Sequence, residues 1–132
     1  MNTKLLMSSS SVFMGITGTA FLFLPIEILN NIGENPSFFN TIFIQIFGGL
    51  YFSFALINWM AKGNLIGGIY SKPLAIGNFS HFFIGSITLI KAAFSVPEMI
   101  YLWIIGLIYL IFAITFALVA FGNPLSKKVS SD

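Results

Sequence analysis

Apolar positions follow one another in four long runs that short polar segments separate. The runs cover about residues 5–24, 38–61, 74–94 and 98–122. A helix of about 20 residues, at about 1.5 Å of rise per residue, crosses a hydrocarbon core of about 30 Å. The pattern therefore predicts an all-α integral membrane protein, a single four-helix domain over residues 1–132. Short connections favour an antiparallel four-helix bundle, and residues 123–132 are left as a short cytoplasmic tail.

The positions of the lysines predict how the chain is oriented. With a cytoplasmic N-terminus, the inner side carries five of the six lysines: Lys4, Lys62, Lys72, Lys127 and Lys128. The outer side carries Lys91 and three of the four acids, which are Glu27, Glu34 and Glu98. Because basic residues in short loops stay on the cytoplasmic side, the sequence predicts an N-in/C-in topology. Lysine without arginine, together with much Ile, Phe and Asn, is typical of an AT-rich bacterial genome.

The connection between the first two runs carries recognisable turn chemistry. Pro25 should end the first helix, and residues 26–32 can form a short helical turn that Gly33 terminates. Asn35 is a favourable helix cap, and Pro36 after it suits the first helical position. Asn35 is therefore the expected cap of the second helix.

Small and polar residues recur at helical spacing in each run, on one face of the predicted helix. These faces are Ser8, Ser11, Gly15, Gly18 and Leu22; Gln45, Gly48, Phe52, Ala55 and Trp59; Asn78, His81, Gly85, Thr88 and Ala92; and Gly106, Tyr109, Ala113, Ala117 and Ala120. Small residues let helix backbones approach closely, which is a main source of helix association in lipid. We therefore predict that these faces point inward and that the other apolar side chains face lipid.

The polar members of these faces are the candidates for chemistry within the membrane. They form a candidate polar membrane cluster of Gln45, Asn78, His81, Thr88 and Tyr109. An ionisable residue within a membrane is a functional-site hypothesis by default. His81 has two interpretations: structural hydrogen bonding, or a role in binding a ligand or handling protons.

The outer ends of the third and fourth predicted helices carry two opposite charges, Lys91 and Glu98. Lys91 lies within a turn of the end of its helix, so its ammonium can reach the outer surface and pair with Glu98 or another outer glutamate. Ser95 to Glu98 fits a capping box that opens the fourth helix.

Several chemistries are excluded by the inventory of side chains. The chain has no cysteine and one histidine, so the usual zinc and non-haem iron sites lack ligands. The apolar runs hold no carboxylate in their interior that could serve a proton pump. Charged residues make up only 8% of the chain, and the lysines form no basic stripe of the kind that binds nucleic acid. We therefore expect no cofactor, no nucleic-acid partner and no enzymatic activity.

The first run is followed by Pro25-Ile26-Glu27-Ile28-Leu29, and the second contains Gly48-Gly49-Leu50-Tyr51. With its length and four helices, the chain resembles the DoxX-like small bacterial inner-membrane proteins. The resemblance implies that this chain lies in the bacterial inner (cytoplasmic) membrane. Some members of that group are associated with quinone or thiol redox systems. The arginine often found near the start of their first helix is missing here, and no functional residue is carried over.

Three functions remain open. The first is a non-enzymatic accessory or structural membrane protein within a homo-oligomer or a larger membrane complex. The second is a small oligomeric carrier or channel, which requires the polar cluster to line a water-accessible cavity. The third is an accessory subunit that binds a quinone or lipid, with His81 or Tyr109 as hydrogen-bond partner.

Overall fold

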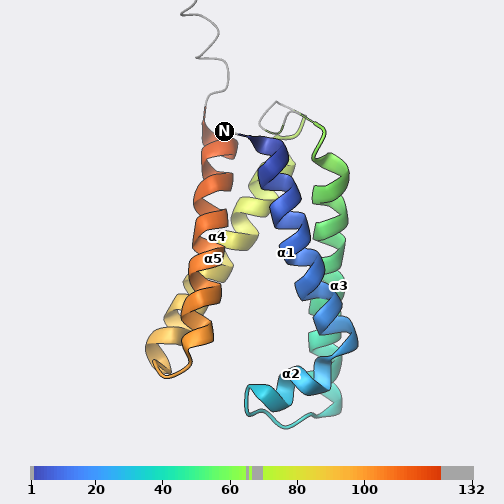
Figure 1. The fold of residues 1–132 in the computed structure, drawn as a ribbon, viewed down its shortest axis with the longest axis vertical. Helices are drawn as coiled ribbons and strands as arrows, with labels where there is room; N and C mark the ends of the chain where they lie inside the picture. The colour runs from blue at the N-terminus through green and yellow to red at the C-terminus, as the bar shows by residue number, and fades with distance from the viewer. Residues whose placement is uncertain (1, 65, 67–69, 123–132) are drawn as a thin grey trace, which may run out of the picture. The chain divides into compact units, whose positions relative to one another are not determined.

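The computed structural model describes residues 2–64, 66 and 70–122, and the described chain is helical (Figure 1). Its helices are α1 (Thr3–Phe23), α2 (Pro25–Asn31), α3 (Phe38–Ala61), α4 (Lys72–Ser95) and α5 (Ile100–Phe121). All except α2 are long and apolar enough to cross a membrane, with 21 to 24 residues each. The all-α class and the four predicted spans are confirmed. The predicted tail, 123–132, lies outside the described residues, as do Lys127 and Lys128.

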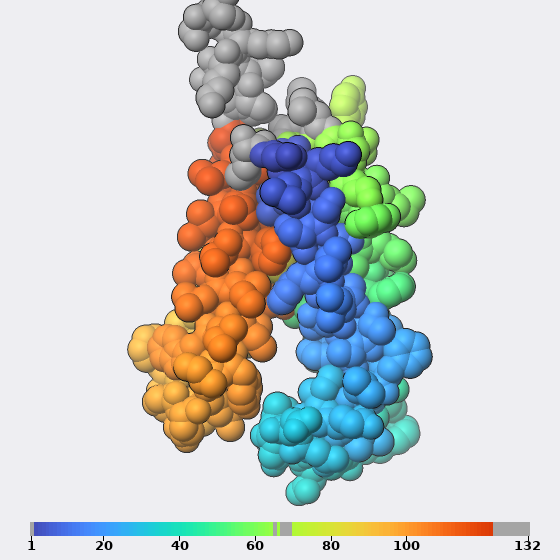
Figure 2. Space-filling view, viewed as in Figure 1, coloured from blue at the N-terminus to red at the C-terminus, as the bar shows by residue number. Residues whose placement is uncertain are grey.

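The chain divides into two compact units, Met1–Gly63 and Asn64–Asp132. In the first, α1 packs along α3, and α2 lies across the end of this hairpin (Figures 1 and 2). In the second, α4 packs along α5. Each unit is thus a helical hairpin, and we call them the first and the second hairpin.

Small residues bring α1 and α3 into backbone contact in the first hairpin. A Cβ atom built on Gly18 would lie 2.7 Å from the backbone nitrogen of Phe52 and 2.8 Å from the carbonyl oxygen of Gly48. Near the other end of the contact, the Ser11 hydroxyl donates to the Ala55 carbonyl at 2.7 Å. Gly18 of α1 thus contacts Gly48 of α3, whereas Ser11, earlier in α1, contacts Ala55, later in α3. The two helices are therefore antiparallel. The predicted inward faces are confirmed at Ser11, Gly18, Gly48 and Ala55. They are wrong for the large side chains of the α3 face, because Gln45, Phe52 and Trp59 are exposed.

Pro25 and Gly33 set the limits of α2, as predicted. A residue before proline is disfavoured in the helical region, and Leu24 has φ −124° and ψ 39°, so α1 ends at Phe23. Gly33 adopts a φ of 80°, which suits glycine at a helix C-terminus. Its conformation lets the Glu34 amide donate to the Leu29 carbonyl at 2.9 Å.

Two predicted helix caps are wrong, although α3 begins at Phe38 as the second apolar run predicted. The cap of α3 is Ser37, not Asn35, because the Ser37 hydroxyl accepts from the Asn40 amide at 3.1 Å. Ser95 is still part of α4, and its hydroxyl donates to the Lys91 carbonyl. The capping box predicted from Ser95 to Glu98 is therefore absent, and α5 begins at Ile100 without a side-chain cap.

The second hairpin is packed mainly by aromatic rings. The Phe82 ring of α4 lies 4.7 Å from that of Phe112 and 5.7 Å from that of Phe116, both on α5. At the far end of the hairpin, Phe94 packs edge-on against Trp103 at 4.8 Å between ring centroids. The predicted inward face of α5 is confirmed, because these members are buried: Gly106, Tyr109, Ala113 and Ala120.

Candidate functional site

The first hairpin holds a buried polar contact between α1 and α3. Asn58 donates through Nδ2 to the Ser10 hydroxyl at 3.1 Å and approaches the Met14 sulfur at 3.9 Å. Ser10, Met14 and Asn58 are each fully buried. Asn58 was not among the residues predicted from the sequence, although it lies three residues after Ala55 and thus next to it on the same helix face. Because polar side chains buried in lipid must be satisfied within the protein, this contact links the two helices.

The second hairpin places His81 and Tyr109 in contact. Their ring centroids are 5.6 Å apart, and both rings also contact Phe82, at 5.1 and 5.2 Å. Tyr109 is buried, with 3% of its surface exposed. A Cβ atom built on Gly85 would lie 2.5 Å from the Tyr109 ring. Gly85 therefore leaves the space in which this ring lies against α4.

The candidate polar membrane cluster is brought together only in part. Asn78 is buried on α4, one turn before His81, and its Nδ2 donates to the Leu74 carbonyl at 3.0 Å. Thr88 is exposed, contrary to the predicted inward face, and donates to the Ile84 carbonyl.

Gln45 belongs to the other hairpin. It is exposed, and its Nε2 lies 3.4 Å from the Leu22 carbonyl oxygen. The structure thus groups His81 and Tyr109, with Asn78 one turn away.

Lys91 and Glu98 both lie at the end of the second hairpin where α4 gives way to α5. Both side chains are exposed. In the described part of the chain no ion pair joins them. Their predicted pairing therefore stays a prediction.

Most hydroxyl groups within the spans bond to the carbonyl three or four residues earlier in their own helix. Thr17, Ser53, Thr88 and Thr115 donate to the fourth preceding carbonyl at 2.8 to 2.9 Å. Ser86, which is buried, donates to Phe83 at 2.8 Å. Such bonds satisfy the hydroxyl locally, so these side chains do not require a ligand or a second helix.

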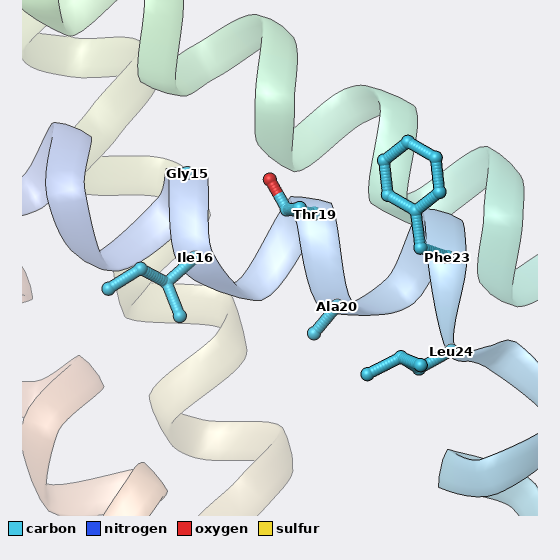
Figure 3. Close-up of a pocket in the computed structure, with 6 residues that line it drawn as sticks. All are labelled: Gly15, Ile16, Thr19, Ala20, Phe23 and Leu24. Atoms are coloured by element: carbon cyan, nitrogen blue, oxygen red, sulfur yellow. The ribbon is translucent and has the colours of Figure 1, made fainter.

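An open apolar groove of about 520 Å³ runs along the second half of α1. It is lined by Gly15, Ile16, Thr19, Ala20, Phe23 and Leu24. Figure 3 shows Ile16, Ala20 and Leu24 on one side of α1, and Thr19 and Phe23 on the other. Its only polar side chain is the Thr19 hydroxyl, so the groove suits hydrocarbon rather than a polar ligand.

Metal-ligating side chains do not gather in the described ranges, where no three of the His, Cys, Asp and Glu residues lie close enough to hold an ion. No family model matches the chain, and no curated protein or solved structure matches it significantly. Its function is therefore argued from the geometry of the two hairpins.

Proposed function

We propose that this chain is a small non-enzymatic membrane protein that acts as an accessory or structural component of an oligomer or a larger membrane complex. The membrane is the bacterial inner membrane, and both termini are cytoplasmic. The four apolar helices agree with a small multi-pass membrane protein. The accessory role rests on how the polar side chains of the spans are used.

The observation that carries the proposal is the local bonding of these polar groups. An enzyme or a channel directs polar side chains toward a shared space where substrate or water can reach them. Here the hydroxyls of Ser53, Thr88 and Thr115 are bonded to their own helix. Asn58 and Ser10 bond to each other between two packed helices. These arrangements support roles in packing rather than in chemistry.

The proposed architecture joins the two hairpins in one antiparallel four-helix bundle over residues 1–132. Each hairpin leaves apolar helix faces that only lipid or another helix can cover in a membrane. The same arrangement follows from the resemblance to DoxX-like proteins.

A second candidate is an accessory subunit that binds a lipid or a quinone. The groove on α1 favours it, because its lining is apolar and open. An isoprenoid or acyl chain is the kind of ligand that such a surface accepts, with the Thr19 hydroxyl as its one polar neighbour.

Purification from native membranes separates these candidates. The tagged full chain, extracted in mild detergent and analysed by native mass spectrometry, should carry a protein partner or further copies of itself in fixed stoichiometry. A tagged unrelated four-helix membrane protein from the same cells is the control. Recovery of the bare chain alone, or of a partner that the control also captures, would contradict the accessory role. A quinone or lipid at one copy per chain, without protein partners, would favour the second candidate.

A further inference from the structure

The end of the first hairpin at which α3 terminates carries a lysine held over a tryptophan ring. The Lys62 ammonium lies 2.8 Å from the centroid of the Trp59 ring. The two residues are three positions apart and therefore share one side of the last helical turn. An ammonium over an indole face is attracted by the ring quadrupole. Trp59 nevertheless remains 49% exposed, so this charged pair is open to its surroundings.

Lys4 lies at the same end of the hairpin. The bond between Ser11 and Ala55 defines the register of the two antiparallel helices. Lys4 and Lys62 each lie seven residues beyond this bond, on α1 and at the end of α3. Seven residues are about two helical turns, which return to nearly the same side of a helix. The register therefore brings Lys4 to the level of Lys62, and Lys4 is exposed.

In the first hairpin the lysines lie at one end and the acidic residues at the other. Its two acids, Glu27 and Glu34, lie at the opposite end, in and after α2, and both are exposed. No carboxylate in the described part of this hairpin is therefore placed to neutralise Lys4 and Lys62. The end that bears the lysines is complementary to an anion.

The chemistry of this end fits the headgroup of a lipid. Tryptophan side chains prefer the headgroup level of a membrane, which places Trp59 beside lipid phosphates. Lysine ammonium groups on flexible stems bind phosphate as point charges. A lysine near an anionic membrane surface contributes about a five-fold preference for that surface. We propose that Lys4, Trp59 and Lys62 form a binding site for the phosphate of an anionic phospholipid.

Quenching of Trp59 fluorescence by brominated lipids tests this proposal directly. The full chain carrying Trp103→Phe, which retains an aromatic ring against Phe94, leaves Trp59 as the only tryptophan. It is reconstituted in phosphatidylcholine vesicles with a minor fraction of brominated phosphatidylglycerol or brominated phosphatidylcholine. We expect the anionic lipid to quench several-fold more strongly. Lys4→Gln or Lys62→Gln should each lower this preference, by up to about five-fold.

Matched variants distinguish the site from a general effect of charge. Lys62→Arg keeps the charge and should keep the preference, and Lys91→Gln, on α4 in the second hairpin, should leave it unchanged. Circular dichroism shows whether each variant retains its helices. Equal quenching by both lipids, or full preference in the variant lacking both Lys4 and Lys62, would overturn the proposal.

Free inorganic phosphate is the other anion that Lys4, Trp59 and Lys62 could bind. Inorganic phosphate added to vesicles of phosphatidylcholine alone should leave Trp59 emission unchanged. A phosphate-induced change in that emission, together with equal quenching by the two brominated lipids, would assign the site to a free anion and refute lipid binding.

Discussion

Gly48 and Gly49 are adjacent glycines of α3 that should respond in opposite ways to the same substitution. A Cβ atom on Gly48 would lie 2.9 Å from the Gly18 carbonyl oxygen, the Leu22 nitrogen and the Phe21 Cβ. A Cβ atom on Gly49 would meet nothing within 4 Å. Gly48→Ala should therefore destabilise the first hairpin, whereas Gly49→Ala should not.

The size of the effect follows from this geometry. Carbon contacts are most favourable at about 3.5–4.0 Å, so α1 and α3 must separate by roughly 0.5–1 Å to admit the methyl group. A gap of that size removes about a quarter to a half of the van der Waals energy of each contact between the two helices. Two of the three nearest atoms belong to the backbone of α1, so no side-chain rotation can relieve the overlap. We expect a loss of about 2 kcal/mol in the free energy of unfolding, within the usual range for overpacking.

Unfolding in mixed detergent micelles by increasing dodecyl sulfate measures this difference. Far-ultraviolet circular dichroism reports helix loss, and in a chain that also carries Trp103→Phe the fluorescence of Trp59 reports on α3 directly. Gly49→Ala is the matched control, because it adds the same methyl group to the same helix one position away. It should be neutral, or more stable by up to about 1 kcal/mol through helix propensity.

Equal unfolding free energies for Gly48→Ala and Gly49→Ala would refute the backbone contact between α1 and α3. The reciprocal change at Gly18 provides an independent check, because its Cβ would meet Phe52 and Gly48 backbone atoms. At Gly15 the nearest atom is the Ala55 Cβ at 3.6 Å, an ordinary contact, so Gly15→Ala should be tolerated.

Two further predictions concern the second hairpin and the topology. Gly85→Ala should lower stability by about 1 kcal/mol, because the new methyl group displaces the Tyr109 ring, whereas Gly77→Ala has open space and should not. Equal melting temperatures for these two variants in detergent would contradict the packing of the Tyr109 ring against α4. A cysteine replacing Asn31 should react with an impermeant thiol reagent in intact cells, and one replacing Asn64 should be protected. Labelling of position 64 from outside would contradict the N-in/C-in topology.

The packed faces of the helices could be predicted from the sequence where a small residue was the deciding feature. Gly18, Gly48 and Ala55 were assigned to inward faces, and the structure places them in the contact between α1 and α3. In lipid a large apolar side chain has nearly the same free energy on the packed face and on the lipid-facing side of its helix. A regularly spaced small residue is therefore the more informative sign of a packed face. Gly49 shows the limit of this signal, since it adjoins the face but a Cβ atom added there would meet nothing within 4 Å.

Other positions could not be predicted from spacing alone. Asn35 and Ser37 are both good caps, and the choice between them depended on which side chain could reach a free amide. Thr88 shares the spacing of His81 and yet is exposed, with its hydroxyl bonded to the Ile84 carbonyl of its own helix. Asn58 was not selected at all, since one amide near a helix end carries no periodic signal.

The sequence by itself determined the four spans and their approximate ends. Their length is a local quantity, set by the thickness of the hydrocarbon core and by prolines and glycines such as Pro25 and Gly33. Only the tertiary structure decided which helices pair and which polar groups meet. Asn58 and Ser10 are separated by 48 positions, and their hydrogen bond exists only because two helices pack in one register. Such a contact depends on the fit of two surfaces, and the side-chain spacing along either helix does not contain that information.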